Sequence, residues 1–269
     1  MSAGAIHPTA VVAADASIGS GTTIGAHAVI ESGVAIGADC EIQAHAVLCA
    51  RTTIGRRNLV GYGAVLGGDP QAIGFERACE SGLVVGDDNI IREHATLHRS
   101  TKAGQVTRVG SHNFLMAGAH VGHDCLLGDH VIMANNCLLG GHVSIGDRVF
   151  LGGGTVCHQF IRIGERAITQ GISGFGKDLP PFLIGAGVNR VAGVNSVGLK
   201  RSGMPPAQRS QIRALHRLFF REGRSLGNAL EEARSRDDWD PPARRFLEFI
   251  ESTGSRGVCS APRPGDEPA

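Results

Sequence analysis

The segment HVGHDCLLGDHVIMANNCLLGGHVSIG, residues 120–146, carries a large apolar residue at every sixth position. The same rhythm runs from Ile6 to Leu66 and, after an interruption, from Val85 to Ile163. A period of six matches neither the 3.6-residue turn of a helix nor the two-residue alternation of a strand. It is typical of hexapeptide repeats, so we predict an all-β solenoid in which each short strand forms one flat side of a triangular coil.

The other positions of each hexad agree with this prediction. Glycine often follows the apolar residue, as at Gly122 and Gly146, where a turn between two flat sides favours a residue without a Cβ atom. A small residue such as Cys125 or Cys137 stands four positions after the apolar one, because a narrow interior leaves little space beside the large side chain. The repeat therefore specifies which side chains enter the core.

Composition restricts the class of protein. A net charge of +1 argues against a nucleic-acid binder. The first residues, MSAGAIHPTA, lack the basic and apolar parts of a signal peptide, and no apolar run is long enough to span a bilayer. The seven cysteines are odd in number and form no CxxC motif, which indicates reduced core residues in a cytoplasmic protein.

The chain divides into four parts. Residues 1–190 form the predicted coil, interrupted at 67–84 by a segment rich in Gly, Pro and charge that we expect to protrude as a loop. Residues 191–203 form a connecting segment. From 204 to 253, apolar residues recur at helical spacing, which predicts a small α-helical domain. Residues 254–269 are rich in Gly, Pro, Ser and Arg, and we expect a disordered tail.

Histidines gather in one part of the coil. Eight of the twelve lie between His94 and His158. With three hexads per turn, residues 18 apart become neighbours on one face, on strands separated by roughly 4.8 Å. The hexads that open at Val121, Leu139 and Cys157 therefore stack. They bring together His123, Asp124, Gly141, His142, His158 and Gln159.

This stacking predicts acid–base chemistry. Gly141 lies one turn beyond His123, so a backbone N–H near this glycine is expected to point toward a group held by the imidazole, like an oxyanion site beside a general base. We expect His120 at the corner just before this face. Since adjacent strand residues point to opposite faces, we expect Asp124 to pair with His142 rather than with His123.

Several motifs make the chain resemble a known family. HVGHDC (120–125), GGHVSIG (140–146), HQF (158–160), the proline pair at 180 and 181, and GVNSVGLKRSG (193–203) are similar to segments of the acyl-carrier-protein-dependent UDP-N-acetylglucosamine O-acyltransferases that begin lipid A synthesis. IHPTA near the start, GDPQ at 68–71, IREHATLHR at 91–99 and the helical tail extend the resemblance over nearly the whole chain. The family implies a left-handed parallel β-helix and a homotrimer with active sites between subunits. It also implies acyl carrier protein as donor, a UDP-sugar as acceptor, and no cofactor or metal.

The resemblance also implies roles for particular residues. His123 would remove the proton from the sugar 3-hydroxyl as this attacks the acyl thioester, and the Gly141 N–H would stabilise the tetrahedral oxyanion. Gly171 matches the position that sets acyl-chain length, and a glycine there leaves room for a longer chain. The other matches line the sugar and acyl pocket or bind the nucleotide, and they are His98, His120, His142, His158, Gln159, Asn195 and Arg201.

Four positions depart from the family pattern. The Asp and Lys that usually follow GDPQ are Ala72 and Gly74, and a later acidic residue and second Arg are Val197 and Ser202. Each lost charged hydrogen bond weakens binding by roughly 1.5 to 3 kcal/mol. The acceptor sugar, the acyl length, O- against N-acylation and turnover itself therefore stay open. A paralogue that acylates another nucleotide sugar is an alternative.

A row of arginines indicates a partner surface. Arg209, Arg213, Arg217 and Arg221 recur every four residues and form one basic stripe along the first predicted helix of the C-terminal domain. A solvated charged face is the simpler interpretation. Because the family's donor is carried on a strongly acidic carrier protein, the stripe is also a candidate dock for acyl carrier protein.

Two other classes of protein fit parts of the sequence. The HxxH motif at His120 and His123 is compatible with a trimeric zinc enzyme of the carbonic anhydrase type, which shares the hexapeptide coil. The missing substrate contacts are compatible with a non-catalytic hexapeptide binding protein. The acyltransferase motifs, and His123 one turn from Gly141, favour the enzyme over both.

Overall fold

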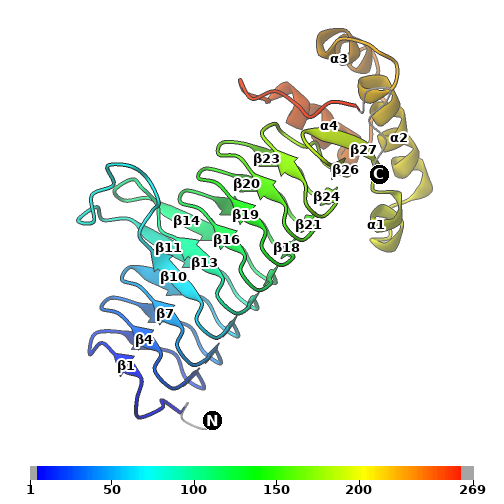
Figure 1. Cartoon of the computed structure of the whole chain (residues 1–269). Coiled ribbons are helices and arrows are strands. Elements are labelled where there is room, and N and C mark those ends of the chain that lie inside the picture. Colours follow the sequence, from blue (N-terminus) through cyan, green and yellow to red (C-terminus); the bar gives the residue numbers. More distant parts are fainter. Residues whose placement is uncertain (1–4, 262–269) are drawn as a thin grey trace.

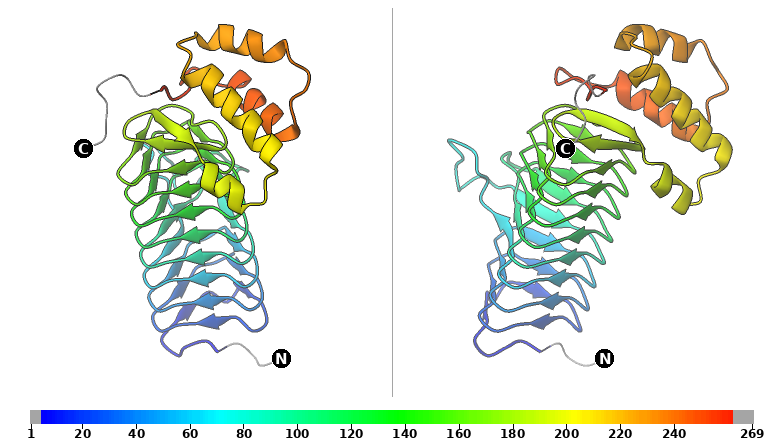
Figure 2. Two further views of the ribbon diagram at one scale, coloured as in Figure 1. Left: turned by 90° about the vertical axis from the view of Figure 1, so that its right-hand side faces the viewer. Right: turned by 45° about the vertical axis from the view of Figure 1, so that its right-hand side comes forward.

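The computed structural model describes residues 5–261 and has the form of a long three-sided coil with helices at one end (Figure 1). Three sheets of very short strands form the sides, and successive strands pass from one sheet to the next. Figure 2 shows the stacked turns from two further directions, with the helical domain beyond the last of them. This is the hexapeptide β-helix with a C-terminal helical domain that the sequence predicts.

The strands are grouped here by sheet. Sheet 1 contains β1 (Val11–Val12), β4 (Val29–Ile30), β7 (Val47–Leu48), β10 (Val65–Gly68), β13 (Thr96–His98), β16 (His120–Val121), β19 (Leu138–Leu139), β22 (Val156–Cys157) and β25 (Gly174–Phe175). Sheet 2 contains β2 (Ser17–Ile18), β5 (Ala35–Ile36), β8 (Thr52–Ile54), β11 (Gly82–Val85), β14 (Val106–Val109), β17 (Leu126–Leu127), β20 (Ser144–Ile145) and β23 (Arg162–Ile163). Sheet 3 contains β3 (Thr23–Ile24), β6 (Glu41–Ile42), β9 (Leu59–Val60), β12 (Ile90–Ile91), β15 (Phe114–Leu115), β18 (Ile132–Met133), β21 (Phe150–Leu151), β24 (Ile168–Thr169), β26 (Leu183–Ala186) and β27 (Arg190–Val194).

The pairing register confirms that three hexads complete one turn. Val121 in β16 pairs with Leu139 in β19, and Leu139 pairs with Cys157 in β22, all in parallel. Each of these three side chains is buried in the interior of the coil. Residues that are three hexads apart therefore occupy the same position on successive rungs, as the sequence predicts.

Two insertions enlarge the corner between sheets 1 and 2. Leu66 pairs with Leu97 and Val85 pairs with Val109, so both of these turns are longer than three hexads. The first insertion is the predicted loop, but β10 and β11 extend into the expected range of 67–84 and leave residues 69–81 outside the strands. The second insertion, residues 99–105, was not predicted, because one additional hexad leaves the phase unchanged on either side.

The corners of the coil explain why histidines recur in this sequence. Corner residues such as Asp88, His112, Asp124 and His142 have φ angles of 58, 59, 60 and 61°. This left-handed region is tolerated best by Gly, Asn, Asp and His. Side chains from successive corners then stack, as in the 4.9 Å contact between the rings of His112 and His130. A histidine at a corner is therefore a feature of the fold before it is a feature of any site.

The C-terminal part begins with the antiparallel pair β26–β27 and continues as α1 (Ser196–Arg201), α2 (Pro206–Phe220), α3 (Leu226–Arg234) and α4 (Pro241–Glu251). The rings of Phe219 in α2 and Phe246 in α4 lie 5.8 Å apart. Arg162 of the coil donates to the carbonyl of Phe249 at 2.9 Å and pairs with Asp178, which joins α4 to the last turns. Within the described residues, no helix is both long and apolar enough to cross a membrane.

The prediction of a disordered tail is wrong for residues 254–261. Val258 forms a β-bridge with Asp178, Ser260 forms one with Arg190, and Cys259 between them is buried. Residues 254–261 therefore close the end of the coil, because alternate residues supply backbone groups to its last strands and one apolar side chain to its core. Residues 262–269 of that prediction lie outside the described residues.

Candidate active site

The predicted site residues meet on the outer surface of sheet 1 and at its corner with sheet 2. His120 lies in β16, and His123 and Asp124 follow that strand. Gly141 and His142 occupy the equivalent positions after β19, one rung further on. His120 was expected at a corner but is an outward-facing strand residue, half-buried beside the site.

His123 and Gly141 are in direct contact across the two rungs. A Cβ atom built on Gly141 would lie 2.5 Å from Nε2 of His123, so any other residue at 141 would displace the imidazole. The flanking amides are occupied, since Gly140 N donates to Cys157 O and His142 N donates to His123 O, both at 2.9 Å. Among the described residues, the Gly141 N–H has no backbone acceptor. It is available to an oxygen beside His123.

Asp124 is hydrogen-bonded to His123, whereas His142 lies only within ion-pair distance of it, contrary to our expectation. Nδ1–H of His123 donates to Oδ2 of Asp124 at 2.8 Å, whereas Nε2 of His142 stays 3.6 Å from the same oxygen and makes no hydrogen bond. The rule of alternating faces fails because Asp124 is a corner residue with φ of 60° and does not continue the strand. With Nδ1 donating to the carboxylate, Nε2 of His123 is the nitrogen left to accept a proton, and it lies against the space above Gly141.

The carboxylate of Asp124 is held by residues that the sequence did not indicate. Ser100 and Thr101, both from the unpredicted insertion, donate side-chain hydrogen bonds to its two oxygens. Although burial raises it, these bonds and that from His123 lower the pKa of Asp124 to about 2. The group is therefore a carboxylate throughout the neutral range. The only signal in the sequence is the extra hexad between Leu97 and Val109.

His98 and His120 lie next to His123 and are uncharged near neutral pH. Their rings meet edge to face at 4.8 Å, and Nδ1 of His120 is hydrogen-bonded to the Thr96 hydroxyl at 2.7 Å. Burial, reinforced by the neighbouring histidines, lowers the pKa of His98 to about 4 and also lowers that of His120. Nδ1 of His98 is buried without a hydrogen-bond partner among the described residues.

The next rung contributes a more open surface. The ring of His142 stacks on Phe160 at 4.5 Å and meets His123 edge to face at 5.2 Å. His158 and Gln159 follow β22 and are exposed. The cluster therefore passes from a buried end at His98 to an accessible end at Gln159.

The residues predicted for the nucleotide lie at the start of the helical domain. The side chain of Asn195 caps α1 by accepting from Gly198 N at 3.0 Å and donates to Arg166 O at 2.9 Å, so both of its polar groups are engaged within the chain. Arg201 and Val197 are exposed, and the Ser202 hydroxyl donates to Leu199 O at 2.9 Å. Of this group, Arg201 is the member with an accessible charge.

The tip of the loop at 69–81 is apolar where the family pattern has charges. Ile73 is fully exposed, and Gly74 has a φ of 78° with no atom within 4 Å of a built Cβ. Ala72 and Gly74 therefore leave no polar side chain at these two positions.

The remaining predicted positions are accessible. Arg213, Arg217 and Arg221 are exposed on α2 and at its end, while Arg209 is half-buried and its Nε has no partner among the described residues. Gly171 is exposed after β24, and a Cβ built there would meet only the backbone of Gly153, at 3.1 Å from its carbonyl oxygen.

His123, Asp124 and His142 also form the set within the described residues whose ligand atoms lie close enough for one metal ion, all within 4.8 Å. The carboxylate of this set already accepts from Ser100, Thr101 and His123. These hydrogen bonds are more typical of a carboxylate that orients an imidazole than of a carboxylate that binds a metal ion.

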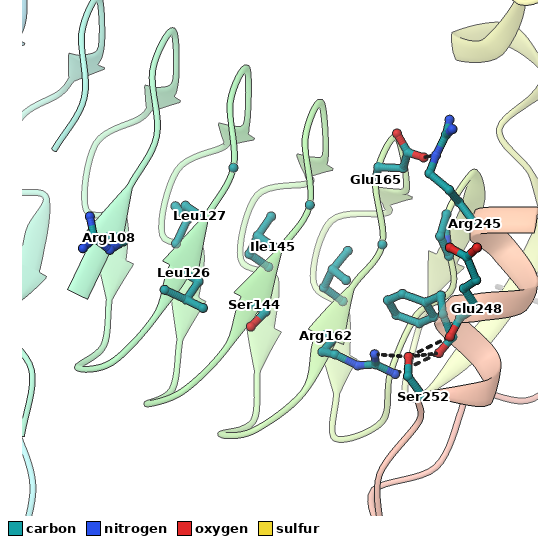
Figure 3. A pocket seen from close by; sticks show the side chains of 16 residues that line it. Arg108, Leu126, Leu127, Ser144, Ile145, Arg162, Glu165, Arg245, Glu248 and Ser252 are labelled. Atoms are coloured by element: carbon teal, nitrogen blue, oxygen red, sulfur yellow. Dashed lines mark hydrogen bonds and ion pairs between the residues drawn. The ribbon is translucent and has the colours of Figure 1, made fainter. Parts of the chain in front are cut away.

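A cavity of about 610 Å³ lies away from this cluster, between sheet 2 and α4 (Figure 3). Leu126 and Ser144 on the sheet and Phe249 on the helix line it, and the ion pair between Arg245 and Glu165 stands beside it. It contains none of the histidines. The acid–base cluster is therefore on a different, open side of the coil.

Comparison with known proteins agrees with the motifs. Residues 178–259 match the family model described as UDP N-acetylglucosamine O-acyltransferase, domain 2, and residues 107–141 match the bacterial transferase hexapeptide model. An acyl-[acyl-carrier-protein]–UDP-N-acetylglucosamine O-acyltransferase from Anaeromyxobacter sp. is 38% identical over 94% of this chain and 99% of its own. The corresponding protein of Paraburkholderia xenovorans is 39% identical over 94% of this chain and 98% of its own.

Solved structures give the same result. The UDP-N-acetylglucosamine acyltransferase of Francisella novicida superimposes with a TM-score of 0.92 at 33% identity, covering 97% of this chain and 96% of that one. The Arabidopsis enzyme superimposes with a TM-score of 0.85 at 32% identity, covering 95% of this chain and 100% of that one.

The three-sided coil and the match to the hexapeptide model place the chain in the class of bacterial hexapeptide transferases. Within that class, full-length similarity is decisive. The chain belongs to the acyl-[acyl-carrier-protein]–UDP-N-acetylglucosamine O-acyltransferase family.

Proposed function

We propose that this protein transfers a 3-hydroxyacyl chain from acyl carrier protein to the 3-hydroxyl of UDP-N-acetylglucosamine, the first step of lipid A biosynthesis. The observation that carries the proposal is the contact between Nε2 of His123 and Gly141, at the site where the family's motifs coincide. We place the protein in the reducing cytoplasm, in agreement with its seven free cysteines.

The geometry supports direct transfer without a covalent enzyme intermediate. Nε2 of His123 takes the proton of the sugar hydroxyl as the oxygen attacks the thioester carbonyl. The Gly141 N–H stabilises the negative charge that develops on that carbonyl oxygen, and Asp124 stabilises the resulting imidazolium. His123 then returns the proton to the leaving thiolate as the tetrahedral intermediate collapses.

The test is a direct assay with a panel of substrates. Purified protein is incubated with 3-hydroxyacyl carrier proteins of several chain lengths and with UDP-N-acetylglucosamine or its 3-amino analogue, and products are identified by mass. We expect an ester of UDP-N-acetylglucosamine. Preferred amide formation on the 3-amino sugar would instead favour the paralogue that Ala72 and Gly74 suggest, and no transfer to either sugar would contradict the proposal.

Outward-facing side chains support a homotrimer. Sheet 3 presents an apolar row that includes Phe114, Ile132 and Phe150, and sheet 1 presents Leu138 and Val156, which are 43% and 44% exposed in the single chain. Over the same height sheet 2 presents Arg108, Ser144 and Arg162, with Leu126 as the apolar exception. Two apolar sides and one polar side fit a threefold arrangement in which sheet 3 of one chain covers sheet 1 of the next and closes the site.

Sedimentation tests the trimer. We expect Ile132→Glu to dissociate the assembly and to remove activity together with it, because a charge would enter the covered surface. Ser144→Glu places the same charge on sheet 2 and should leave both unchanged. A monomeric wild-type protein with full activity would contradict the arrangement.

The exposed arginines of α2 support docking of acyl carrier protein. Arg213→Glu combined with Arg217→Glu should raise KM for the carrier-bound donor about tenfold, with little change in kcat or in KM for the UDP-sugar. The reversal of Arg56 and Arg92, two exposed arginines on the coil, is the matched control. An unchanged KM in the α2 variant would remove the stripe from the binding surface.

Gly171 supports an acyl pocket that takes a long chain. The position is accessible and a Cβ would meet only backbone. Gly171→Met should shift the preferred donor toward shorter chains, measured as kcat/KM across the same series of carrier proteins. An unaltered preference would place the end of the acyl chain elsewhere.

A further inference from the structure

The two insertions in the coil lie on the rungs directly before the catalytic corner. Residues 69–81 follow β10, residues 99–105 follow β13, and Asp124 follows β16, so all three occupy the corner between sheets 1 and 2. The loops also support each other, since Ser81 Oγ donates to Ser100 O and Ser100 N donates to Gly82 O at 3.2 Å.

The buried side chain of Arg99 holds the two loops together. Its side chain is only 7% exposed and binds Asp69 at 2.9 Å, Arg77 O at 2.8 Å and Cys79 O at 2.5 Å. One buried guanidinium therefore ties the longer loop to the start of the shorter one. Because Arg99 is anchored in this way, the backbone of the residue that follows it is also held in place.

That following residue is Ser100, and its side chain reaches the catalytic carboxylate. Ser100 is fully buried, and its hydroxyl donates to Oδ1 of Asp124. Thr101 donates to Oδ2 from its hydroxyl at 2.7 Å and from its backbone N–H at 3.2 Å. Together with Nδ1–H of His123 at 2.8 Å, four donors cover both oxygens of one carboxylate.

We propose that Ser100 and Thr101 are positioning residues for acyl transfer, which hold Asp124 in the one orientation that keeps Nδ1–H of His123 bonded and Nε2 directed at the acceptor hydroxyl. A carboxylate held by only one imidazole can rotate and lose that alignment, and small misplacements of a base are costly. The two hydroxyls are neutral, so they fix the carboxylate without cancelling the charge that stabilises imidazolium. This inference rests on His123 being the base of the proposed function.

Other titratable groups stay in place when either hydroxyl is removed. His98, His120 and His142 surround His123, and Lys102 acts on His142. Loss of a hydroxyl therefore weakens the hold on Asp124 and leaves the charged groups around His123 unaltered.

The experiment compares Ser100→Ala and Thr101→Val with the wild-type enzyme. We expect kcat to fall roughly tenfold for each, within the range of coupling between residues in contact, with KM for both substrates changed less than twofold. Ser100→Thr keeps a hydroxyl and should recover most of the rate. Ser32→Ala is the matched control, because it removes a hydrogen bond of the same kind, 2.7 Å from Ser32 Oγ to Asp15, far along the coil.

A double-mutant cycle separates positioning from general structure. In an Asp124→Asn background, the further effect of Ser100→Ala should nearly vanish, because the group it positions is gone. The downfield proton resonance of His123 Nδ1–H should be present in the wild type and shifted or lost in Ser100→Ala, which reports on the bond even if the variant is less stable. An equal loss of kcat in both backgrounds, or an unmoved resonance, would overturn the proposal. An active His123→Ala enzyme would instead overturn the assignment of the base.

Discussion

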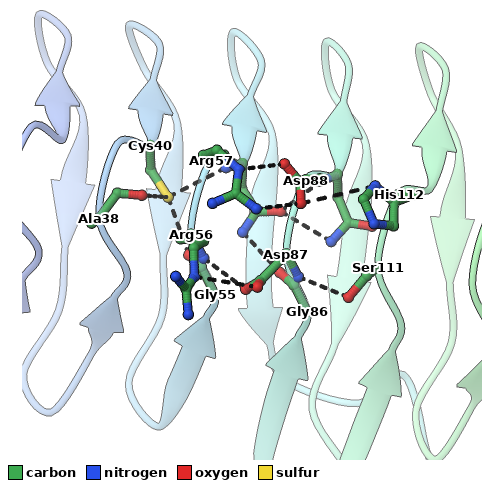
Figure 4. A network of polar contacts seen from close by, with 12 residues as sticks. Ala38, Cys40, Gly55, Arg56, Arg57, Gly86, Asp87, Asp88, Ser111 and His112 are labelled. Carbon is green, nitrogen blue, oxygen red and sulfur yellow. Dashed lines mark hydrogen bonds and ion pairs between the residues drawn. The ribbon is translucent and has the colours of Figure 1, made fainter.

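Two corners of the same coil carry an aspartate with the same left-handed backbone geometry near a histidine, but the two carboxylates have different partners. Between sheets 2 and 3, Asp88 is bound by Arg57 through two bonds of 2.6 and 2.7 Å, with His112 at 3.8 Å (Figure 4). Between sheets 1 and 2, Asp124 is bound by hydroxyls and by His123. Both aspartates have φ angles in the left-handed region, 58 and 60°.

The difference lies in what neutralises the carboxylate and in how much water reaches it. The guanidinium of Arg57 satisfies Asp88, and the side chain of His112 is 51% exposed, so that network is a solvated surface contact of small energetic value. At the other corner His123 and Asp124 are 15% and 10% exposed, and no arginine or lysine of the described residues is paired with the carboxylate. The two corners differ because the insertion at 99–105 supplies hydroxyls to Asp124 where Arg57 binds Asp88.

Removal of the imidazole should give the largest contrast between the corners. His123→Ala should lower the rate of acyl transfer by about 10³-fold or more, because the general base is lost. His112→Ala should leave the rate within twofold. Thioester consumption measured for both variants checks this, and a similar loss in both would mean that the corner histidines act on folding rather than on chemistry.

A methyl group at position 141 should have the next largest effect. The Cβ of Gly141→Ala would overlap the His123 ring, so we expect kcat to fall about 10²-fold as the base and the N–H move apart. Gly227→Ala in α3, where the built Cβ meets nothing, should keep full activity and stabilise the helix by about 0.5–1 kcal/mol. Equal activity of the two variants would show that the close contact at Gly141 is not needed.

Substitution of the two aspartates should give a smaller difference in kcat between the corners. Asp124→Asn should lower kcat about 10- to 100-fold, because the amide no longer stabilises imidazolium or fixes the tautomer. Asp88→Asn breaks the pair with Arg57 and should leave kcat unchanged. Steady-state kinetics and thermal unfolding of both variants check this. A drop in kcat for Asp88→Asn would show that the corner at Asp88 also contributes to the reaction.

Acid should weaken the buried site in a defined pH range. The folded-state pKa of His98 is lowered to about 4 by burial and nearby histidines, so the unfolded chain binds more protons between about pH 4 and 6.5. Stability should therefore fall by up to about 3 kcal/mol as the pH drops through this range. Asp124, with a pKa of about 2, contributes stability above its unfolded pKa of 3.8 and loses it only in stronger acid.

Denaturant unfolding at pH 7, 6, 5 and 4.5 measures this slope. His98→Asn should flatten it, since the group that takes up the proton on unfolding is removed. A slope identical to that of the wild type would assign the acid sensitivity to other histidines.

Much of the molecule is predictable from its sequence because the repeat is local. The hexad rhythm specifies the coil, and the spacing of three hexads by itself places Gly141 beside His123. The pairing of Asp124 was predicted wrongly, because strand alternation was applied to a residue that turns the corner. Ser100 and Thr101 were missed, because an insertion of one hexad's length leaves the rhythm intact. The order of residues 254–261 was missed too, because composition does not show which backbone groups the last turn leaves open.

The sequence alone determined the solenoid, its helical cap and the rung on which the imidazole meets the glycine, since each follows from a fixed period along the chain. Only the tertiary structure decided which partner holds Asp124 and which loop supplies the hydroxyls. Those contacts join segments that are distant along the chain, and their geometry depends on left-handed corners and on loops anchored by the buried Arg99. No periodic pattern encodes such contacts.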